Sequence, residues 1–525
     1  MAQKGRLVAL VAITIAPTAV GPVVYAQDAP ESWVAPVVRF EPLKAEGSRA
    51  EVPGLGAYRG TVEVRAAGGL SIYNELPLED YVKGIVEMPA AWPAAALQAQ
   101  AIAARTYGLN IQRSRGEICP DDACQFYMGL FGQERDGGQR WAAAVDATAG
   151  QALLAGGQPI LAMFSGSNGG RSVAGGSAYL PAVDDPDDAA SPTHHWHYTL
   201  PLSDFTPFVD VPDGSTLVRI VRDGDSIVAV SKPENGEPSE RTRGADEFAS
   251  AVNASLDAPA GLPLPFPSMT FTLDTEGDQA VVDGGGWGHG RGMSQWGAYG
   301  KAQRGLSASQ ITAAYYGGLR PTALSDEQAA TKIRVALARG RGRTAVTLSR
   351  PSRVVAGDGT VLVPLTFGEW QIRTERGGVR VTGPDDTDQP LAVTDAELTS
   401  RRRVVGSPPT VHFAVTGPAV VTVHMKGPGV ASAPVSIVML EGGVQTVPLP
   451  APRTSGDHTV TIEADGGPGR RAAAEVKFAV RPHVVFEASE AESAQVRPAW
   501  ATLAGLLAAV VALGLAAVAY TRHSR

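Results

Sequence analysis

The residue in this sequence best suited to acid–base chemistry is Glu87, because its neighbours are apolar. Val86, Met88 and Pro89 flank it, and Trp92 follows. If this cluster is partly buried, desolvation raises the pKa of the carboxyl and keeps it protonated near neutral pH. A general acid that protonates a glycosidic oxygen needs that property. From the residues alone, a surface glutamate that ends a helix is the more common interpretation.

A second candidate segment, residues 286–298, carries a glycine at every second position of its first half. Such glycines let the backbone approach a ligand closely and expose the side chains between them. A dinucleotide-binding loop is a weaker interpretation, because no parallel βαβ unit or acidic partner surrounds the motif. A triad of Ser294, His289 and Asp283 lacks the nucleophile-elbow pattern. A tight turn before a helix, with a hydrogen-bonding His289, is also open.

The two cysteines of the chain, Cys119 and Cys124, lie close together in sequence. Outside the cell such a pair most simply forms a disulfide that staples a loop. A metal site is the alternative, but cysteine ligands usually come with two further Cys or His. The nearest histidine in sequence is His194, and residues 194–197 show no carboxylate pattern, so we predict a loop there.

The N-terminal residues 1–26 have the features of a secretory signal peptide. Lys4 and Arg6 precede an apolar stretch, and Ala26 ends a small-residue cleavage signal. An uncleaved N-terminal anchor is the alternative.

The other end contains an uncharged stretch within residues 499–520 that is long enough to span a bilayer as a helix. Arg522 and Arg525 follow it, which predicts a cytoplasmic tail at 521–525. The expected location is therefore extracytoplasmic, anchored in the cell membrane by one C-terminal transmembrane helix.

The composition excludes one large class of partners. The net charge is −8, and no basic patch of the kind that binds nucleic acid is present. With 60 Gly and 39 Pro, β-structure and long loops are more probable than a helical bundle. The length allows about three domains.

Local patterns predict the order of the elements. A central helix is expected from about 93 to 113, and two closing helices at about 293–304 and 308–316. Ser307 and Gln310 form a capping-box pattern. The fold class predicted is α+β for the catalytic domain, with a β-rich insertion at 198–285, followed by β-rich modules and one transmembrane helix.

The predicted boundaries, in chain order, are a signal peptide 1–26, a linker 27–55, a catalytic domain 56–322, a β-rich module 330–400, an immunoglobulin-like sandwich 405–482, a stalk 483–498, a transmembrane helix 499–520 and a tail 521–525. The sandwich is predicted from about six short strands with Gly/Pro turns.

Four segments, in order along the chain, resemble the SpoIID/LytB family. They are residues 76–107, which contain Glu87, residues 124–127, residues 164–170 and the glycine-rich segment 286–298. The resemblance covers residues 58–320 and does not extend to 330–490.

The resemblance implies a lytic transglycosylase that cleaves between MurNAc and GlcNAc of peptidoglycan, with Glu87 as its catalytic residue. It also implies substrate-binding positions near the cleft: Arg105, Ser165, His289, Ser294 and Gln295. Some relatives bind zinc through Cys and His near the cysteine pair. The histidines are missing here, which favours the Cys119–Cys124 disulfide, and neither a metal nor another cofactor is expected.

One glutamate can suffice for such a reaction. Ordinary glycosidases use two carboxylates. A lytic transglycosylase protonates the leaving oxygen with one residue and then uses it as the base for the C6 hydroxyl of the sugar, which gives a 1,6-anhydro end.

The alternative function is a LytB-like module that binds glycan and modifies a cell-wall amidase without cleaving. The expected partners are peptidoglycan glycan strands, with or without stem peptides, and in the alternative an amidase. A further hypothesis is that sugar-stacking residues are among four tryptophans: Trp92, Trp196, Trp287 and Trp296. Core packing is the more common role of any one of them.

Overall fold

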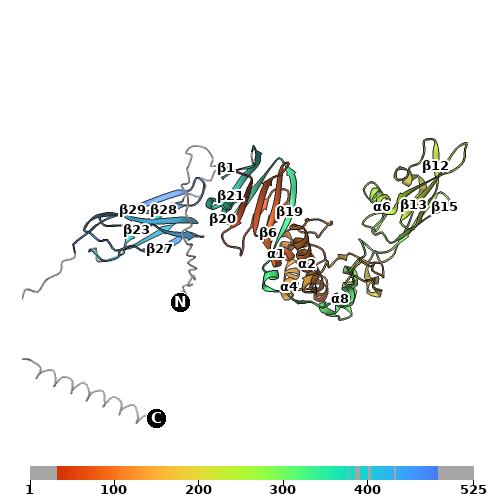
Figure 1. Ribbon diagram of the computed structural model, residues 1–525, viewed down its shortest axis with the longest axis horizontal. Coiled ribbons are helices and arrows are strands. Elements are labelled where there is room, and N and C mark those ends of the chain that lie inside the picture. The colour runs from red at the N-terminus through yellow and green to blue at the C-terminus, as the bar shows by residue number, and fades with distance from the viewer. Residues whose placement is uncertain (1–31, 377, 385–390, 400–403, 431–432, 483–525) are drawn as a thin grey trace, which may run out of the picture.

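The computed structural model describes residues 32–376, 378–384, 391–399, 404–430 and 433–482. Its centre is an antiparallel sheet of ten strands, with helices gathered at one end of it (Figure 1). In spatial order the main path is β1 (Ser32–Ala35), β22 (Gly378–Thr382), β21 (Val361–Glu375), β20 (Arg343–Ala356), β2 (Val37–Pro42), β5 (Thr61–Ala66), β6 (Leu70–Pro77) and β19 (Lys332–Arg341). β3 (Ala50–Val52) pairs with β20 and with β4 (Gly56–Tyr58).

Alternation of side chains explains why these segments form strands. In β2 the side chains of Val38 and Phe40 are buried, whereas Arg39 between them reaches the other face. One continuous hydrophobic core joins strand residues such as Val38 and Val381 to helix residues such as Ile102. The sheet and the helices therefore fold as one unit.

The helix α2 (Ala94–Arg115) lies at the centre of the helical part. It contacts α1 (Leu78–Lys83), α4 (Gly138–Ala147), α7 (Gln295–Gln303) and α8 (Ala308–Tyr315). Its small side chains allow this close packing. At Gly108 an added Cβ would lie 2.8 Å from the ring of Tyr81.

The remaining short elements of the central unit connect these parts. They are α3 (Phe131–Glu134), β7 (Gln151–Ala152), β8 (Leu154–Ala155), β9 (Gln158–Pro159), β10 (Phe164–Ser165), η1 (Pro186–Ala190), β17 (Met293–Ser294), β18 (Thr322–Ala323) and α9 (Asp326–Ala329).

An insertion between η1 and β17 has a hydrophobic core of its own. It contains two three-stranded sheets, β11-β16-β15 and β12-β13-β14. Its elements are β11 (Trp196–Pro201), α5 (Leu202–Phe205), η2 (Thr206–Phe208), β12 (Ser215–Asp223), β13 (Ser226–Pro233), β14 (Ser239–Gly244), α6 (Ala245–Asn253), β15 (Phe271–Glu276) and β16 (Gln279–Gly284).

The C-terminal part of the described chain is a two-sheet sandwich with a third core between the sheets. One sheet is β23-β24-β27 and the other β26-β25-β28-β29. The strands are β23 (Val393–Leu398), β24 (Thr410–Val415), β25 (Ala419–Lys426), β26 (Val435–Met439), β27 (Gly443–Pro448), β28 (Gly456–Asp465) and β29 (Arg471–Val480). In Figure 1 this sandwich and the insertion lie on opposite sides of the central sheet.

The predicted α+β fold class is wrong. Strands account for 44% of the structure and helices for 19%. The physical reason is long-range strand pairing, which no local pattern reveals. The strands within 332–382 were expected in a separate module, but they pair with strands within 37–77. Residues 32–52 were expected in a linker, but they form β1, β2 and β3.

The predicted signal peptide 1–26 and transmembrane helix 499–520 lie outside the described residues. Across 32–482, apart from the gaps given above, no helix combines the length and the hydropathy needed to cross a membrane.

A buried ion cluster ties the central strands together. Glu63 on β5 is only 1% exposed and accepts hydrogen bonds from Arg39 on β2, Arg65 on β5 and Arg334 on β19. Burial by itself would raise the pKa of Glu63, but the hydrogen bonds from Arg334, Arg65 and Arg39 outweigh it and lower the pKa to about 2. The cluster therefore stabilises the fold while Glu63 is ionised.

Glu63→Gln is expected to reduce the free energy of unfolding at pH 7 by about 3 kcal/mol, because the lowered pKa is a folded-state stabilisation of the carboxylate. This contribution is complete above the unfolded-state pKa of about 4.3 and is lost as the pH falls through about 2. Urea unfolding at several pH values measures the difference. Glu41→Gln, which loses a more exposed pair with Arg353, is the control and should cost under about 1 kcal/mol. A difference between wild type and Glu63→Gln that does not change with pH would contradict this account.

Candidate active site around Glu87

Glu87 follows α1 in a short extended segment that pairs with residues 126–128. The N–H of Val86 donates to the carbonyl of Phe126 at 2.8 Å, and the N–H of Met128 donates to the carbonyl of Gly84 at 2.9 Å. The N–H of Phe126 in turn donates to Glu87 Oε1 at 2.8 Å. The backbone thus fixes one oxygen of the carboxyl group.

The surroundings of Glu87 keep its proton more firmly bound than usual. Burial raises the pKa of the carboxyl, and the negative charge of Asp122 adds to this. Hydrogen bonds from the Phe126 N–H and the Gln295 side chain act in the opposite direction, but the net shift is upward. The side chain keeps partial exposure, so a ligand can reach it. Asp122, which is exposed, was not identified from the sequence.

Gln295 reaches Glu87 from the first residue of α7. The preceding residue, Ser294, caps this helix, because its Oγ accepts the N–H of Gly297 at 2.9 Å. The same Oγ donates to Asp188 Oδ1 at 2.6 Å, and the side chain is fully buried. The expectation that Ser294 binds substrate does not fit this position. Ser294 instead places Gln295.

Two buried aspartates, Asp185 and Asp188, which the sequence patterns did not single out, hold residues 167–169 in place. Asp188 accepts hydrogen bonds from Ser167 Oγ at 2.6 Å and from the N–H groups of Asn168 and Gly169 at 3.1 and 3.0 Å. Asp185 accepts the side-chain amide of Asn168 at 2.9 Å.

Asp185 also contacts the two helices α7 and α8. It pairs with Lys301 of α7 and accepts the hydroxyl of Tyr315 of α8 at 2.5 Å. The run Asp184-Asp185-Pro186-Asp187-Asp188 was the available sequence signal, but acidic runs are usually solvated faces, so it did not distinguish a buried network.

Ser165 is the predicted residue whose environment fits a ligand contact best. It lies on β10, which pairs in parallel with β17. Its side chain is 7% exposed, and its Oγ has no hydrogen-bond partner among the described residues. Gly288, at φ +92°, lies so close that an added Cβ would be 3.0 Å from Ser165 Cβ. A buried hydroxyl without a partner is costly unless a ligand or water satisfies it.

His289 lies on the exposed part of the glycine-rich segment. Its Nδ1 accepts the N–H of Arg291 at 2.9 Å, so the other ring nitrogen carries the proton of the neutral form. Although the residue contacts solvent, desolvation by its neighbours lowers the pKa of the ring, and the charge of Arg291 lowers it further. The ring of His289 is therefore neutral at neutral pH, and a hydrogen bond with the backbone of Phe164 already engages it.

Arg105 does not lie in the cleft as expected. It is fully buried and forms a two-point ion pair with Glu79, with Nε to Oε1 at 2.9 Å and an Nη to Oε2 at 2.6 Å. It also donates to the carbonyls of Val145 and Gln151. The prediction that Arg105 binds substrate is therefore replaced by a structural role, which joins α2 to α1 and α4.

The four tryptophans that could stack on sugars differ in their exposure to solvent. Trp92 packs against Trp296 with ring centroids 4.7 Å apart, and Trp196 is buried in the insertion core. Trp287 is 43% exposed. Trp287 alone among these four presents a large open aromatic face.

Cys119 and Cys124 form a disulfide. Both sulfur atoms are thus occupied and are not available as metal ligands. Within the part of the chain that the structure describes, no group of three His, Cys, Asp or Glu could hold a metal ion. His194 and His197 instead bond to Asp188 and Asp283, at 3.0 and 2.9 Å.

Comparisons with known proteins identify the family. The model of the family described as SpoIID, Stage II sporulation protein, matches residues 66–154. Stage II sporulation protein D of Bacillus subtilis is 30% identical over 284 residues, which cover 49% of this chain and 78% of that protein. An uncharacterised protein of Brachyspira hyodysenteriae is 29% identical over 259 residues, covering 47% of this chain and 67% of the other.

The chain belongs to the SpoIID family, so the resemblance seen in the sequence is confirmed. A further relative, the amidase enhancer of Bacillus subtilis, is 28% identical over 290 residues, which cover 45% of this chain and 39% of that protein. These relationships give the protein a role connected with the bacterial cell wall.

Arg105→Ala is expected to lower the free energy of unfolding by about 3–5 kcal/mol, because it leaves the Glu79 carboxylate without its buried partner. Lys83→Ala, which removes a more exposed pair with Asp146, should cost under about 1 kcal/mol and serves as the control. Thermal and urea unfolding measure both. Unchanged stability of Arg105→Ala together with lost glycan binding would instead make Arg105 a substrate contact.

Proposed function

We propose that this protein is a peptidoglycan lytic transglycosylase that cleaves glycan strands between MurNAc and GlcNAc with Glu87 as its single acid–base residue. The observation that carries the proposal is the environment of Glu87. Burial raises its pKa, while the Phe126 N–H and Gln295 hold the carboxyl in one orientation. A protonated, oriented carboxyl is what protonation of a glycosidic oxygen requires.

The proposed reaction needs one carboxyl group used twice. Glu87 donates its proton to the leaving glycosidic oxygen as the C1–O bond of MurNAc breaks. The C6 hydroxyl oxygen of the same sugar then bonds to C1, and its proton passes to the Glu87 carboxylate. No water is consumed, the product carries a 1,6-anhydro ring, and Glu87 ends protonated as it began.

The surrounding residues supply the contacts of the proposed substrate. Ser165 Oγ offers an unused hydrogen-bonding group, and the exposed, neutral ring of His289 offers a contact surface for the sugar. Gln295 orients Glu87, and Trp287 presents an aromatic face of the kind that stacks on sugars. Ser294 and Arg105 act behind this surface, through the placement of α7 and α2.

The proposed substrate places the protein outside the cytoplasm, where peptidoglycan lies. A disulfide is consistent with that compartment. The proposed partners are glycan strands, and the reaction as written uses no cofactor.

A second candidate function is that of a non-catalytic glycan-binding modifier of a cell-wall amidase. The observation in its favour is the similarity to an amidase enhancer. The two functions differ in what they require of Glu87. Glycan cleavage needs its proton, whereas glycan binding needs at most a side chain of the same size and shape.

Glu87→Gln, which keeps the shape and loses the proton, is expected to lower the rate of glycan cleavage by about 10²–10⁴-fold. Mass spectrometry of glycan strands, with and without stem peptides, measures new 1,6-anhydro ends. Glu46→Gln, at an exposed glutamate, is the control and should retain full activity.

The products also separate the alternatives. Reducing ends that contain added water would indicate a hydrolase with a second carboxylate, for which Asp122 is the candidate. No cleavage by the wild type, with glycan binding and stimulation of an amidase retained in Glu87→Gln, would replace the proposal with the modifier function.

Trp287→Ala is expected to raise KM for glycan strands about 5- to 30-fold with a smaller change in kcat, because loss of an aromatic stacking face costs on the order of 1–2 kcal/mol. Trp287→Phe keeps a ring and should recover most of the loss. Steady-state kinetics with strands of defined length provides the measurement. An unchanged KM in the alanine variant would remove Trp287 from the binding surface.

A further inference from the structure

The hydrogen bond from Phe126 to Glu87 depends on a loop whose two ends are held by different parts of the fold. After α2 ends, Ile118 lies against β19: its N–H donates to the carbonyl of Arg334, and its carbonyl accepts the N–H of Ala336, both at 2.9 Å. At the other end of the loop, residues 126–128 pair with the segment that carries Glu87. Phe126 is therefore positioned by everything that fixes residues 119–125.

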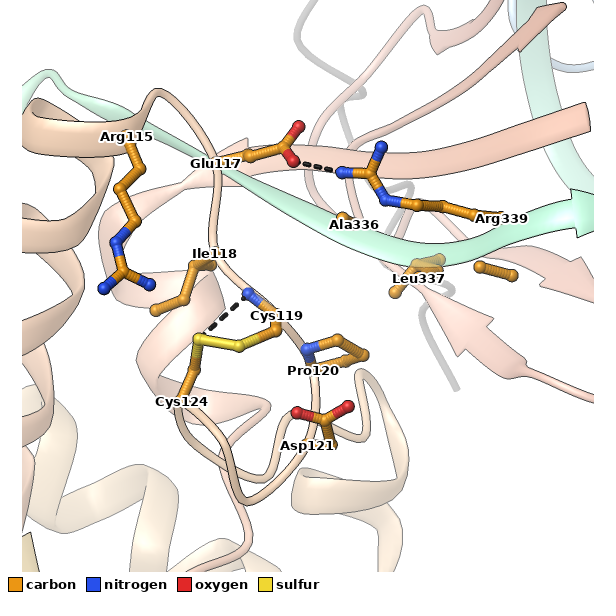
Figure 2. Close-up of a pocket in the computed structure, with 11 residues that line it drawn as sticks. Arg115, Glu117, Ile118, Cys119, Pro120, Asp121, Cys124, Ala336, Leu337 and Arg339 are labelled. Carbon is orange, nitrogen blue, oxygen red and sulfur yellow. Dashed lines mark hydrogen bonds and ion pairs between the residues drawn. A yellow bond between two sulfur atoms is a disulfide. The ribbon is translucent and has the colours of Figure 1, made fainter. Parts of the chain in front are cut away.

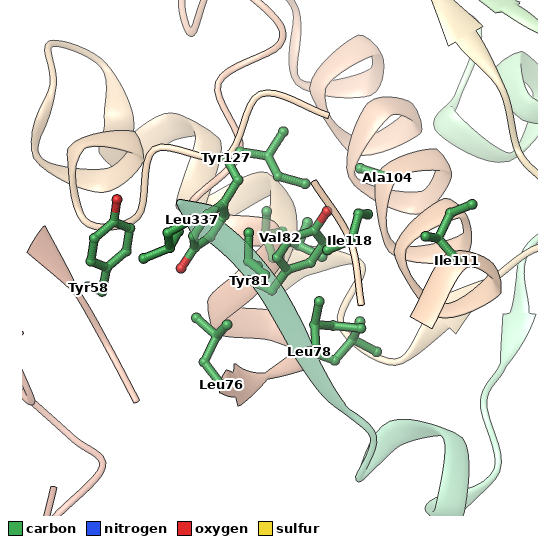
Figure 3. Packing of buried hydrophobic residues seen from close by; sticks show 14 of the residues in the cluster. Tyr58, Leu76, Leu78, Tyr81, Val82, Ala104, Ile111, Ile118, Tyr127 and Leu337 are labelled. Carbon is green, nitrogen blue, oxygen red and sulfur yellow. The ribbon is translucent and has the colours of Figure 1, made fainter. Parts of the chain in front are cut away.

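The residues beside Phe126 are anchored in the core. Gln125 is buried and donates from Nε2 to the hydroxyl of Tyr81 at 3.0 Å and to the carbonyl of Ala104 at 3.2 Å. The ring of Tyr127 stacks between Tyr58 and Tyr81, with centroids 6.0 and 5.3 Å away, as Figure 3 shows. These contacts fix the side chains on both sides of Phe126.

The backbone of the loop is held by the disulfide and a few hydrogen bonds. The N–H of Cys119 points to the sulfur of Cys124 at 3.2 Å, and the N–H of Tyr127 donates to the carbonyl of Pro120 at 2.9 Å. The disulfide joins Cys124, two residues before Phe126, directly to Cys119, which adjoins the β19-bound Ile118. The disulfide therefore links the central sheet covalently to the segment that contains Phe126, whose N–H donates to Glu87.

The disulfide is accessible from a cavity of about 480 Å³ behind the loop. Both cysteines line it, together with Arg115, Asp121 and residues 336–339 of β19 (Figure 2). Glu87 is not among the residues that line this cavity. A small thiol in this cavity would contact the disulfide and not Glu87.

We propose that the Cys119–Cys124 loop is a positioning element of the active site: the intact disulfide holds the Phe126 N–H on the Glu87 carboxyl, and reduction of the disulfide through the cavity releases it. The role of Glu87 in this proposal rests on the proposed function. The positioning of Phe126 by the disulfide does not depend on it. Gln125 and Tyr127 are positioning residues in the same sense.

The redox step is a thiol–disulfide exchange. A dithiol attacks one sulfur of the pair through its thiolate, and the other cysteine leaves as a thiolate and takes up a proton. The second thiol of the reductant then displaces the first cysteine. Two electrons and two protons pass to the protein, the S–S bond breaks, and the dithiol becomes a disulfide. The chain contains two cysteines, so a reductant acts at this bond and at no other.

Loss of the Phe126 donor has a defined consequence for Glu87. The groups that act on this carboxyl are Phe126 and Asp122 of the loop and Gln295 of α7, and its charge is felt by Tyr81 of α1 and Tyr107 of α2. A hydrogen bond to the carboxylate lowers its pKa, so weakening that bond raises the pKa further. The acid then stays protonated to higher pH but donates its proton less readily.

Hydrogen–deuterium exchange tests the positioning directly. The full chain is compared oxidised, reduced with dithiothreitol, and as the double variant Cys119→Ser/Cys124→Ser, with mass spectrometry of the segment 125–128. Reduction and the double variant are each expected to accelerate exchange of the Phe126 amide by about tenfold or more. Dithiothreitol should have no further effect on the double variant. Unchanged exchange in the segment would overturn the proposal whether or not the protein cleaves glycan.

The pH dependence of cleavage tests the link to Glu87. In the reduced wild type and the double variant, the alkaline limb of kcat/KM is expected to move up by about one pH unit while the maximal rate falls. Gln125→Leu, which keeps the disulfide, should shift the limb in the same direction. A lower rate with an unshifted limb would mean general loosening and would overturn the positioning of Glu87. No cleavage by the oxidised wild type would count against the proposed function, and the exchange result would then decide the positioning of Phe126.

Discussion

The pairing of β6 with β19 is the constraint on which the rest of the molecule depends. It joins residues 70–77 to residues 332–341. The chain between these two strands, which includes the helices and the insertion, must therefore begin and end at neighbouring positions in the sheet. The ion cluster of Glu63 with Arg39 and Arg334 reinforces it across three strands. Because Ile118 hydrogen-bonds to β19, the same strand pairing also fixes the start of the loop 119–125, which leads to Phe126 and Glu87.

Two kinds of polar burial serve this molecule in different ways. Asp185 and Asp188 are fully buried, but each is surrounded by donors, so they join residues 167–169 to α7 and to its capping residue Ser294. Ser165 and Glu87 differ from these aspartates. Ser165 Oγ has no hydrogen-bond partner among the described residues, and burial of Glu87 outweighs the hydrogen bonds that stabilise its carboxylate. The satisfied groups provide rigidity, and the unsatisfied ones are free to bind. A site whose donors were all paired internally would have nothing left to offer a ligand.

Much of the site could be predicted from local sequence, and much of the fold could not. The apolar neighbours of Glu87 indicated that its pKa would be raised if the cluster were buried, and the capping box of Ser307 and Gln310 is present as predicted. Such features depend on residues within one turn or one short segment. The central sheet depends on partners up to 350 residues apart, as in the pairing of Ser32 on β1 with Thr382 on β22. Alternation patterns do not tell which strand pairs with which.

The same limit explains the misplaced site residues. Arg105 and Ser294 belong to motif segments, and position in a motif does not separate a side chain that binds a ligand from one that supports its neighbour. The deciding fact is the partner: Glu79 for Arg105 and Asp188 for Ser294. A charged or hydroxyl group already paired inside the core must break that pair before it can bind substrate. In the proposed reaction Glu87 is the only acid–base residue, so its position depends on this buried support and no second carboxyl can compensate for a shift.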